Sequence, residues 1–154
     1  MKNVRVLKLG TNCKDKATRL TGMLTHWVLD MDGRVVYIFQ PKGLDDKCQP
    51  LNSLLLGEAR LEVPRGAFEE IGVPVEILGT QLTDRASGFT GMATKFIRHI
   101  NGCFHVFIQP KGVVKGTGLP VAENDFDLRQ CAGELITKLS EAELKKSKEE
   151  TPSP

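Results

Sequence analysis

Two aspartates at matching positions, three histidines and four cysteines are the residues of this chain whose types could do chemistry. A catalytic carboxylate needs a second carboxylate or a histidine with which to exchange a proton. Asp15 and Asp84 occupy equivalent places in two similar stretches, but neither has such a partner at a matching position. We therefore interpret both as turn-forming residues whose carboxylates accept backbone N–H groups.

The histidines and cysteines do not form a recognisable catalytic or metal-binding motif. His99 and His105 flank one predicted hairpin and are expected to lie near each other, while His26 is distant in sequence. The cysteines show no metal-ligand spacing. Ser87 and Cys103 lack the surroundings of an activated nucleophile. The sequence thus predicts no enzyme activity, no catalytic residues, no metal site and no cofactor.

The elements that position these residues come from an internal repeat. Residues 4–43 recur without a gap at 73–112, with an offset of 69 residues as in Val4 and Val73. Roughly two positions in five are identical, including Gln-Pro-Lys-Gly at 40–43 and at 109–112. We infer a tandem duplication of one small unit.

Each copy reads as a series of short strands. The first copy predicts strands at 4–9, 22–29, 34–40 and 59–63, a polar loop at 12–21, one helical turn at 64–70 and a strand at 73–78 that opens the second copy. Asp32-Gly33 and Asn101-Gly102 predict type I′ hairpins. Trp27 and Phe96 hold one matched position, which we expect in the core. The second copy predicts a shorter loop at 113–123 and strands at 126–129 and 135–139.

The fold class predicted from this order is all-β, with two tandem SH3-like small barrels and a short C-terminal helix. The barrels are expected at residues 1–72 and 73–139, and a helical arm and tail at 140–154. Ser140 and Glu143 form a capping-box pattern that predicts a helix over 141–148.

Charge and hydropathy set limits on the partners. The 21 basic and 19 acidic residues nearly balance, so bulk charge does not indicate nucleic acid. No apolar run approaches 18 residues, which predicts no transmembrane helix and no membrane partner. Because Met1 leads directly into a strand pattern, we expect synthesis in the cytoplasm without a signal peptide.

The second copy also carries a family resemblance. Its segment from Asp84 to Gly91 (DRASGFTG), followed by Asn101-Gly102-Cys103, resembles small, mostly uncharacterised proteins of tailed bacteriophages. The first copy departs from this pattern, with Arg19-Leu20 in place of Gly88-Phe89. The resemblance implies a phage origin, and therefore the host cytoplasm as the place of synthesis.

These observations favour a non-enzymatic phage structural protein, an accessory virion component such as a capsid decoration or connector protein. It would dock on other phage structural proteins as a homo-oligomer or within a symmetric assembly, and so reside in the virion. The alternative is an intracellular SH3-like protein that binds nucleic acid or modulates the host. We expect the partner-binding residues in the rim loops, together with the chain after Ser140; they are Asp15, Lys16, Gln40, Lys42, Asp84, Arg85, Phe89, Gln109 and Lys111.

Overall fold

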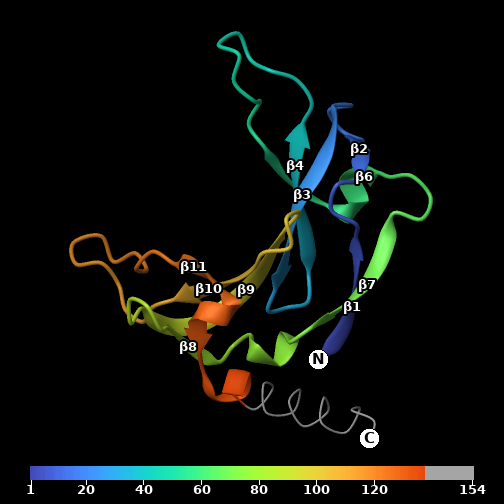
Figure 1. Cartoon of the computed structure of the whole chain (residues 1–154). Helices are drawn as coiled ribbons and strands as arrows, with labels where there is room; N and C mark the ends of the chain where they lie inside the picture. Colours follow the sequence, from blue (N-terminus) through green and yellow to red (C-terminus); the bar gives the residue numbers. More distant parts are fainter. Residues whose placement is uncertain (138–154) are drawn as a thin grey trace, which may run out of the picture.

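The computed structural model describes residues 1–137 and confirms an all-β fold with a short C-terminal helix (Figure 1). The helix predicted at 141–148 lies outside the described residues. The strands are β1 (Lys2–Leu7), β2 (Asn12–Asp15), β3 (Thr21–Asp30), β4 (Val35–Pro41), β5 (Leu54–Gly57), β6 (Leu61–Glu62), β7 (Phe68–Val73), β8 (Gln81–Asp84), β9 (Thr90–His99), β10 (Phe104–Gln109), β11 (Asn124–Asp127) and β12 (Cys131–Ala132). Three single turns of 3₁₀ helix accompany them: η1 (Glu58–Arg60), η2 (Val75–Ile77) and η3 (Leu128–Gln130).

The duplication is visible element by element. β2, β3 and β4 correspond to β8, β9 and β10 at the offset seen in the sequence. Beyond β4 the match continues through β5, η1 and β6, which correspond to β11, η3 and β12 with the offset raised by one residue. The extra residue lies in the loop before β11, so the prediction of a shorter loop in the second copy was wrong.

The two copies share one sheet instead of forming two separate barrels. The sheets are open, and six strands run in the order β5, β4, β3, β9, β10, β11, with β2 and β8 attached to the beginnings of β3 and β9. β3 pairs antiparallel with β9, and Val28 lies opposite Ile97. Val28 and Ile97 are also counterparts in the repeat. The pairing therefore relates the copies by an approximate two-fold axis through these two residues.

The hairpin turns occur where the sequence predicted them but have a different geometry. Gly33 and Gly102 have φ of 84° and 92°, whereas Asp32 and Asn101 do not have positive φ. Gly33 N–H donates to the Asp30 carbonyl, and Asp30 N–H donates to the Arg34 carbonyl. These bonds define a three-residue loop with a bulge at the glycine. Type I′ was wrong because only the glycine, and not the residue before it, adopts the left-handed region.

The duplication breaks at the ends of the copies. β1 pairs with β7, which begins at Phe68, so the helical turn predicted at 64–70 was wrong for residues 68–70. The predicted strand 73–78 is replaced by the end of β7 and by η2. Residues 134–137 are helical, so the strand predicted at 135–139 was wrong for its described part. The loop predicted at 12–21 contains β2, which pairs with β3 and β6.

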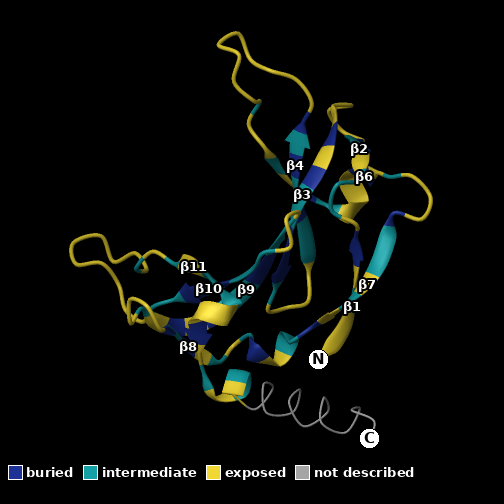
Figure 2. Cartoon of the chain, in the orientation of Figure 1, coloured by how far each residue is buried: buried dark blue, intermediate teal, exposed yellow. Residues whose placement is uncertain are grey.

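One hydrophobic core serves both copies (Figure 2). Trp27 and Phe96 are 1% and 0% exposed, which confirms the predicted core position. Phe104 contacts both of them, with ring centroids 5.9 Å from Trp27 and 4.8 Å from Phe96. Tyr37 is also buried, and its hydroxyl accepts the N–H of Leu7 at 2.9 Å, which fixes β1 on the sheet.

Candidate docking surface

The two matched aspartates close the tight turns that precede β3 and β9. Asp15 and Asp84 are 0% and 1% exposed. Asp15 accepts the N–H groups of Ala17 and Thr18 and the Thr18 hydroxyl, and Asp84 accepts the corresponding groups of Ala86 and Ser87. The capping interpretation is confirmed. Both carboxylates are buried and are not exposed to a partner.

A different residue completes each turn. Arg60 donates two hydrogen bonds to Asp15, at 3.0 and 2.6 Å, whereas Gln130 donates one to Asp84 at 2.6 Å. Arg60, followed by the Thr18 hydroxyl, holds the pKa of Asp15 far below its ordinary value. The pKa of Asp84 is also lowered, first by Ser87 and then by Gln130. The two aspartates therefore stay ionised and cannot act as general acids near neutral pH.

The repeated Gln-Pro-Lys-Gly block builds the base of a long loop. Gln40 Nε2 donates to the Leu51 carbonyl at 2.7 Å, and Gln109 Nε2 donates to the Val121 carbonyl at 2.6 Å. Each bond ties the start of the loop to its end. We call residues 42–53 the first arm and residues 110–123 the second arm. Figure 1 shows both arms projecting from the sheet, the first at the top and the second at the left.

Each arm carries an exposed lysine followed two residues later by an exposed apolar residue. Lys42 and Leu44 lead the first arm, and Lys111 and Val113 lead the second. Leu44 is 63% exposed and Val113 is 61% exposed. Neither lysine forms an ion pair with any described residue. The glutamines therefore have a structural role at the arm bases, whereas no ion pair within the described residues explains why lysine follows them.

The predicted rim residues form two separate groups. Lys16 and Lys42 lie at the same end of the β3–β4 hairpin, because β3 begins after the first turn and β4 ends at the first arm. Arg85 and Lys111 form the equivalent group at the start of β9. Since β3 and β9 are antiparallel, the two groups lie on opposite sides of the two-fold axis. Phe89 is half-buried against Phe126, with ring centroids 5.4 Å apart.

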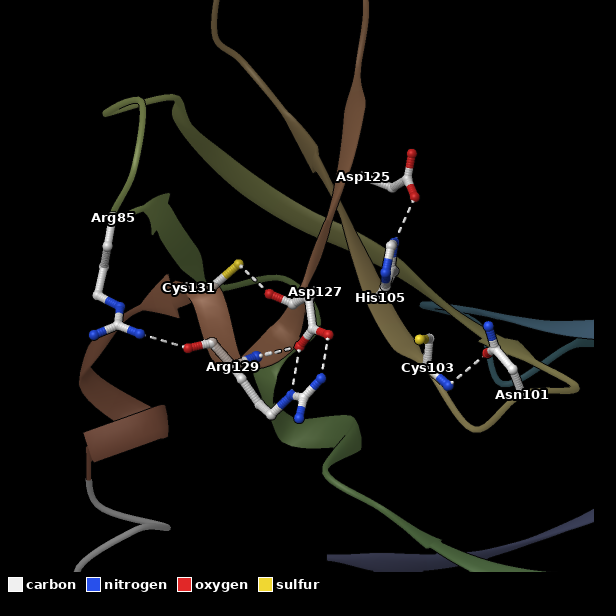
Figure 3. A network of polar contacts seen from close by, with 8 residues as sticks. All are labelled: Arg85, Asn101, Cys103, His105, Asp125, Asp127, Arg129 and Cys131. Atoms are coloured by element: carbon white, nitrogen blue, oxygen red, sulfur yellow. Dashed lines mark hydrogen bonds and ion pairs between the residues drawn. The ribbon is translucent and has the colours of Figure 1, made fainter.

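A polar network near η3 contains several ionisable side chains of the second copy (Figure 3). Arg129 donates to both carboxylate oxygens of Asp127, at 3.0 and 2.8 Å, and lowers the pKa of Asp127 to about 2. Arg85 donates to the Arg129 carbonyl at 2.7 Å. Burial raises the pKa of Cys131 to about 11, and its thiol points at the Asp127 carbonyl. A thiol held protonated is a poor nucleophile.

A histidine pair crosses the boundary between the copies, and the sequence did not predict it. His26 Nε2 lies 2.8 Å from His99 Nδ1, and Thr25 Oγ1 lies 2.7 Å from His26 Nδ1. His105 is next to His99, as expected from the hairpin, and bonds to Asp125 at 2.8 Å. The pairing of β3 with β9 creates this contact across 73 residues of sequence, so no local signal could have indicated it.

Two further features were expected, from the sequence, to be absent: a metal site and a membrane-spanning helix. Among residues 1–137, no group of three or more His, Cys, Asp or Glu side chains could hold a metal ion. No helix in the same residues is long and apolar enough to cross a membrane. A pocket of about 760 Å³ is lined by Cys103, Cys131 and Asp127 among other residues, and burial raises the pKa of the Cys131 thiol.

Comparison with known proteins adds no assignment. No protein-family model, no curated protein and no solved structure matches the chain.

Proposed function

We propose that this protein is a non-enzymatic docking protein, an accessory component of a phage particle that attaches to neighbouring structural subunits through its two arms. The observation that carries the proposal is the matched pair of exposed residues on each arm, Lys42 with Leu44 and Lys111 with Val113. The glutamine bonds at the arm bases hold these residues in place before binding, which reduces the entropy lost on docking. The resemblance to phage proteins supports the particle as the site of action.

The arms indicate the chemistry of the partner surface. An unpaired lysine beside an exposed aliphatic side chain fits a carboxylate beside an apolar pocket. Because the copies are related by an approximate two-fold axis, the protein presents this contact twice. It would therefore bridge two copies of the same subunit, or occupy a two-fold position of an assembly. Two weak contacts made by one rigid molecule reinforce each other.

Mass spectrometry of purified particles tests the proposal. The chain should be present in many copies per particle. A variant with both arms altered, Lys42→Glu and Leu44→Asp with Lys111→Glu and Val113→Asp, should be lost from particles. The matched control is Lys47→Glu with Lys115→Glu, because these lysines lie in the same arms but have no lysine counterpart in the other copy.

Two results would count against the proposal. Particles that lack the wild-type chain exclude the virion role, and equal incorporation of the arm variant and its control excludes the arms. In the first case, a gel shift with single- and double-stranded DNA and with RNA over a salt series tests the alternative. Nucleic-acid binding through the basic residues must weaken steeply with salt.

A further inference from the structure

The open sheet has two outer edges, and the duplication makes them equivalents of each other. β5 pairs only with β4, and β11 pairs only with β10, among the described residues. In an antiparallel strand alternate residues direct their N–H and C=O groups to opposite sides. Each edge strand therefore has backbone groups available to a further strand.

The two edges differ in how they are protected. β11 reads Asn124-Asp125-Phe126-Asp127, with Glu123 before it, whereas β5 reads Leu54-Leu55-Leu56-Gly57. Charged residues on an edge strand oppose the addition of another strand. Asp125 is the structural counterpart of Leu55, which is 65% exposed. One edge is thus acidic, and the other is uncharged and apolar.

We propose that the β5 edge binds the β5 edge of a second copy of this chain, which forms a two-fold dimer. Antiparallel β5–β5 pairing joins the backbone edges and places the two Leu55 side chains side by side, with no charge brought into the contact. The six-stranded sheets of the two chains then form one continuous sheet. The inference concerns self-association and does not rest on the proposed role in a particle.

The acidic β11 edge explains why a second chain joins at β5 and why no third chain is added. Pairing of β11 with β11 would bring Asp125 and Asp127 of one chain against those of the other, and like charges on adjacent strands repel. Pairing of β5 with β11 would remove those carboxylates from water against Leu55, and it would continue from chain to chain as an open filament. Only β5–β5 pairing avoids both the repulsion and the desolvation of the carboxylates, and it gives a closed two-chain assembly.

The chain already shows this type of pairing within itself. β3 and β9, two equivalent strands, pair antiparallel about the Val28–Ile97 point. The arm that precedes β5 adds Leu44, which is 63% exposed and forms a β-bridge with Pro50, four residues before the strand. The dimer would carry both arms of each chain, and the two first arms would lie closest to the new axis.

Sedimentation equilibrium of the full chain tests the dimer. From 1 to 200 µM we expect the mass to rise from that of a 17.0 kDa monomer toward twice that value. Leu55→Asp should weaken dimerisation by at least about 100-fold, because it places two carboxylates in the contact. This variant should fold, since Asp125 occupies the equivalent position in the second copy. Circular dichroism and the Tm check folding.

A matched control distinguishes pairing at the β5 edge from nonspecific association of exposed apolar residues. Leu119→Asp changes a leucine that is 64% exposed but lies in the second arm, away from β5, and it should dimerise within about 10-fold of wild type. Hydrogen exchange at low and high protein concentration should show slower exchange at residues 54–57 in the dimer and no change at 124–127. A wild-type monomer at 200 µM, a Leu55→Asp dimer of unchanged affinity, or protection at β11 instead of β5 would each overturn the proposal.

Discussion

The two copies of the repeat keep one hydrogen-bond framework while differing in the side chains that complete it. The turn before β3 is closed by Asp15 with Arg60, and the turn before β9 is closed by Asp84 with Gln130. The same backbone bonds flank both turns, from Asp15 N–H to the Leu20 carbonyl and from Asp84 N–H to the Phe89 carbonyl. The comparison shows that geometry is shared by the copies and that charge is where they differ.

The boundary between the copies shows the same division. Across the two-fold axis, His26 lies opposite His99, whereas their counterparts Lys95 and Asp30 lie opposite each other. At the outer edges, Leu55 in one copy stands where Asp125 stands in the other. A strictly symmetric molecule would have two equal edges and two equal halves of its central contact. The two outer edges and the two halves of the central contact therefore differ in charge, while their backbone pairing is the same.

The largest effect is expected from removing a core aromatic residue in either copy. Phe39→Ala in the first copy and Phe96→Ala in the second should each lower the free energy of unfolding by about 3–5 kcal/mol, because both residues are 0% exposed. If the copies share one core, both variants shift a single transition. Urea unfolding followed by Trp27 fluorescence and by circular dichroism should give the same midpoint for each variant. Two separate midpoints would show that the copies unfold independently.

The next effect concerns the two turn-closing aspartates. Asp15→Asn should lower the Tm by about 5–10 °C, because it leaves the Arg60 guanidinium without its carboxylate. Asp84→Asn should lower the Tm less, because its partner Gln130 is neutral and no buried charge is left unpaired. Arg60→Gln reproduces the arrangement of the second copy and should cost least. Differential scanning fluorimetry at pH 7 gives the ranking, and an equal loss for Asp15→Asn and Asp84→Asn would contradict it.

The same two aspartates should make the Tm sensitive to acid. Both have a pKa in the folded protein below the ordinary value of 3.8, so their contribution to stability is complete above that pH and is lost as the pH falls further. Between pH 4 and pH 2, the Tm of wild type should therefore fall more than that of the double variant Asp15→Asn with Asp84→Asn. A parallel fall would assign the acid sensitivity to other carboxylates.

A smaller effect is expected at the histidine pair. Burial, followed by the charge of His99, lowers the pKa of His26 below the ordinary value of 6.5. Burial, followed by the charge of His105, lowers the pKa of His99 in the same direction. The unfolded chain then binds protons more readily, so stability is present above pH 6.5 and decreases as the pH falls below it. His105 and Asp125 face the same site, and Asp125 opposes part of the effect on His99.

Thermal unfolding from pH 8 to pH 5 measures this contribution. Wild type should lose more stability over that range than His26→Gln, which keeps a polar side chain but removes the titration. His105→Gln serves as the comparison, because it lies beside the pair but outside the 2.8 Å contact between the copies. If His26→Gln and wild type have the same pH dependence, the pair does not sense pH.

Much of the fold could be predicted from the sequence, but the way the copies join could not. The repeat, the all-β class, the hairpins and the buried position of Trp27 and Phe96 all follow from local patterns. The shared sheet depends on β3 meeting β9, which no local pattern encodes. β5 was not among the predicted strands because the one-residue change of offset hides its match with β11.

The candidate site divides in the same way. The matched aspartates and glutamines were found because they recur. The turn role of the aspartates follows from their chemistry, whereas the glutamines were predicted to bind a partner and the structure shows their side chains bonded at the arm bases. Arg60 and Gln130 were missed because they are 45 and 46 residues from the aspartates that they contact. The burial of Asp15 and Asp84 also decides that the exposed lysines, and not the carboxylates, are available to a partner.

The smallest predicted effect comes from one backbone position in the matched turns. Arg19 has a φ of 66°, and its counterpart Gly88 has a φ of 82°. Glycine adopts this left-handed conformation without a steric penalty, whereas a residue with a side chain is strained there. Arg19→Gly should therefore raise the free energy of unfolding by about 0.5–1 kcal/mol, even though it removes the exposed pair with Glu62 at 3.6 Å. Gly88→Arg should lower it by about 1–2 kcal/mol. Urea unfolding of both variants measures the pair, and changes of the same sign would show that the two turns do not share one backbone requirement.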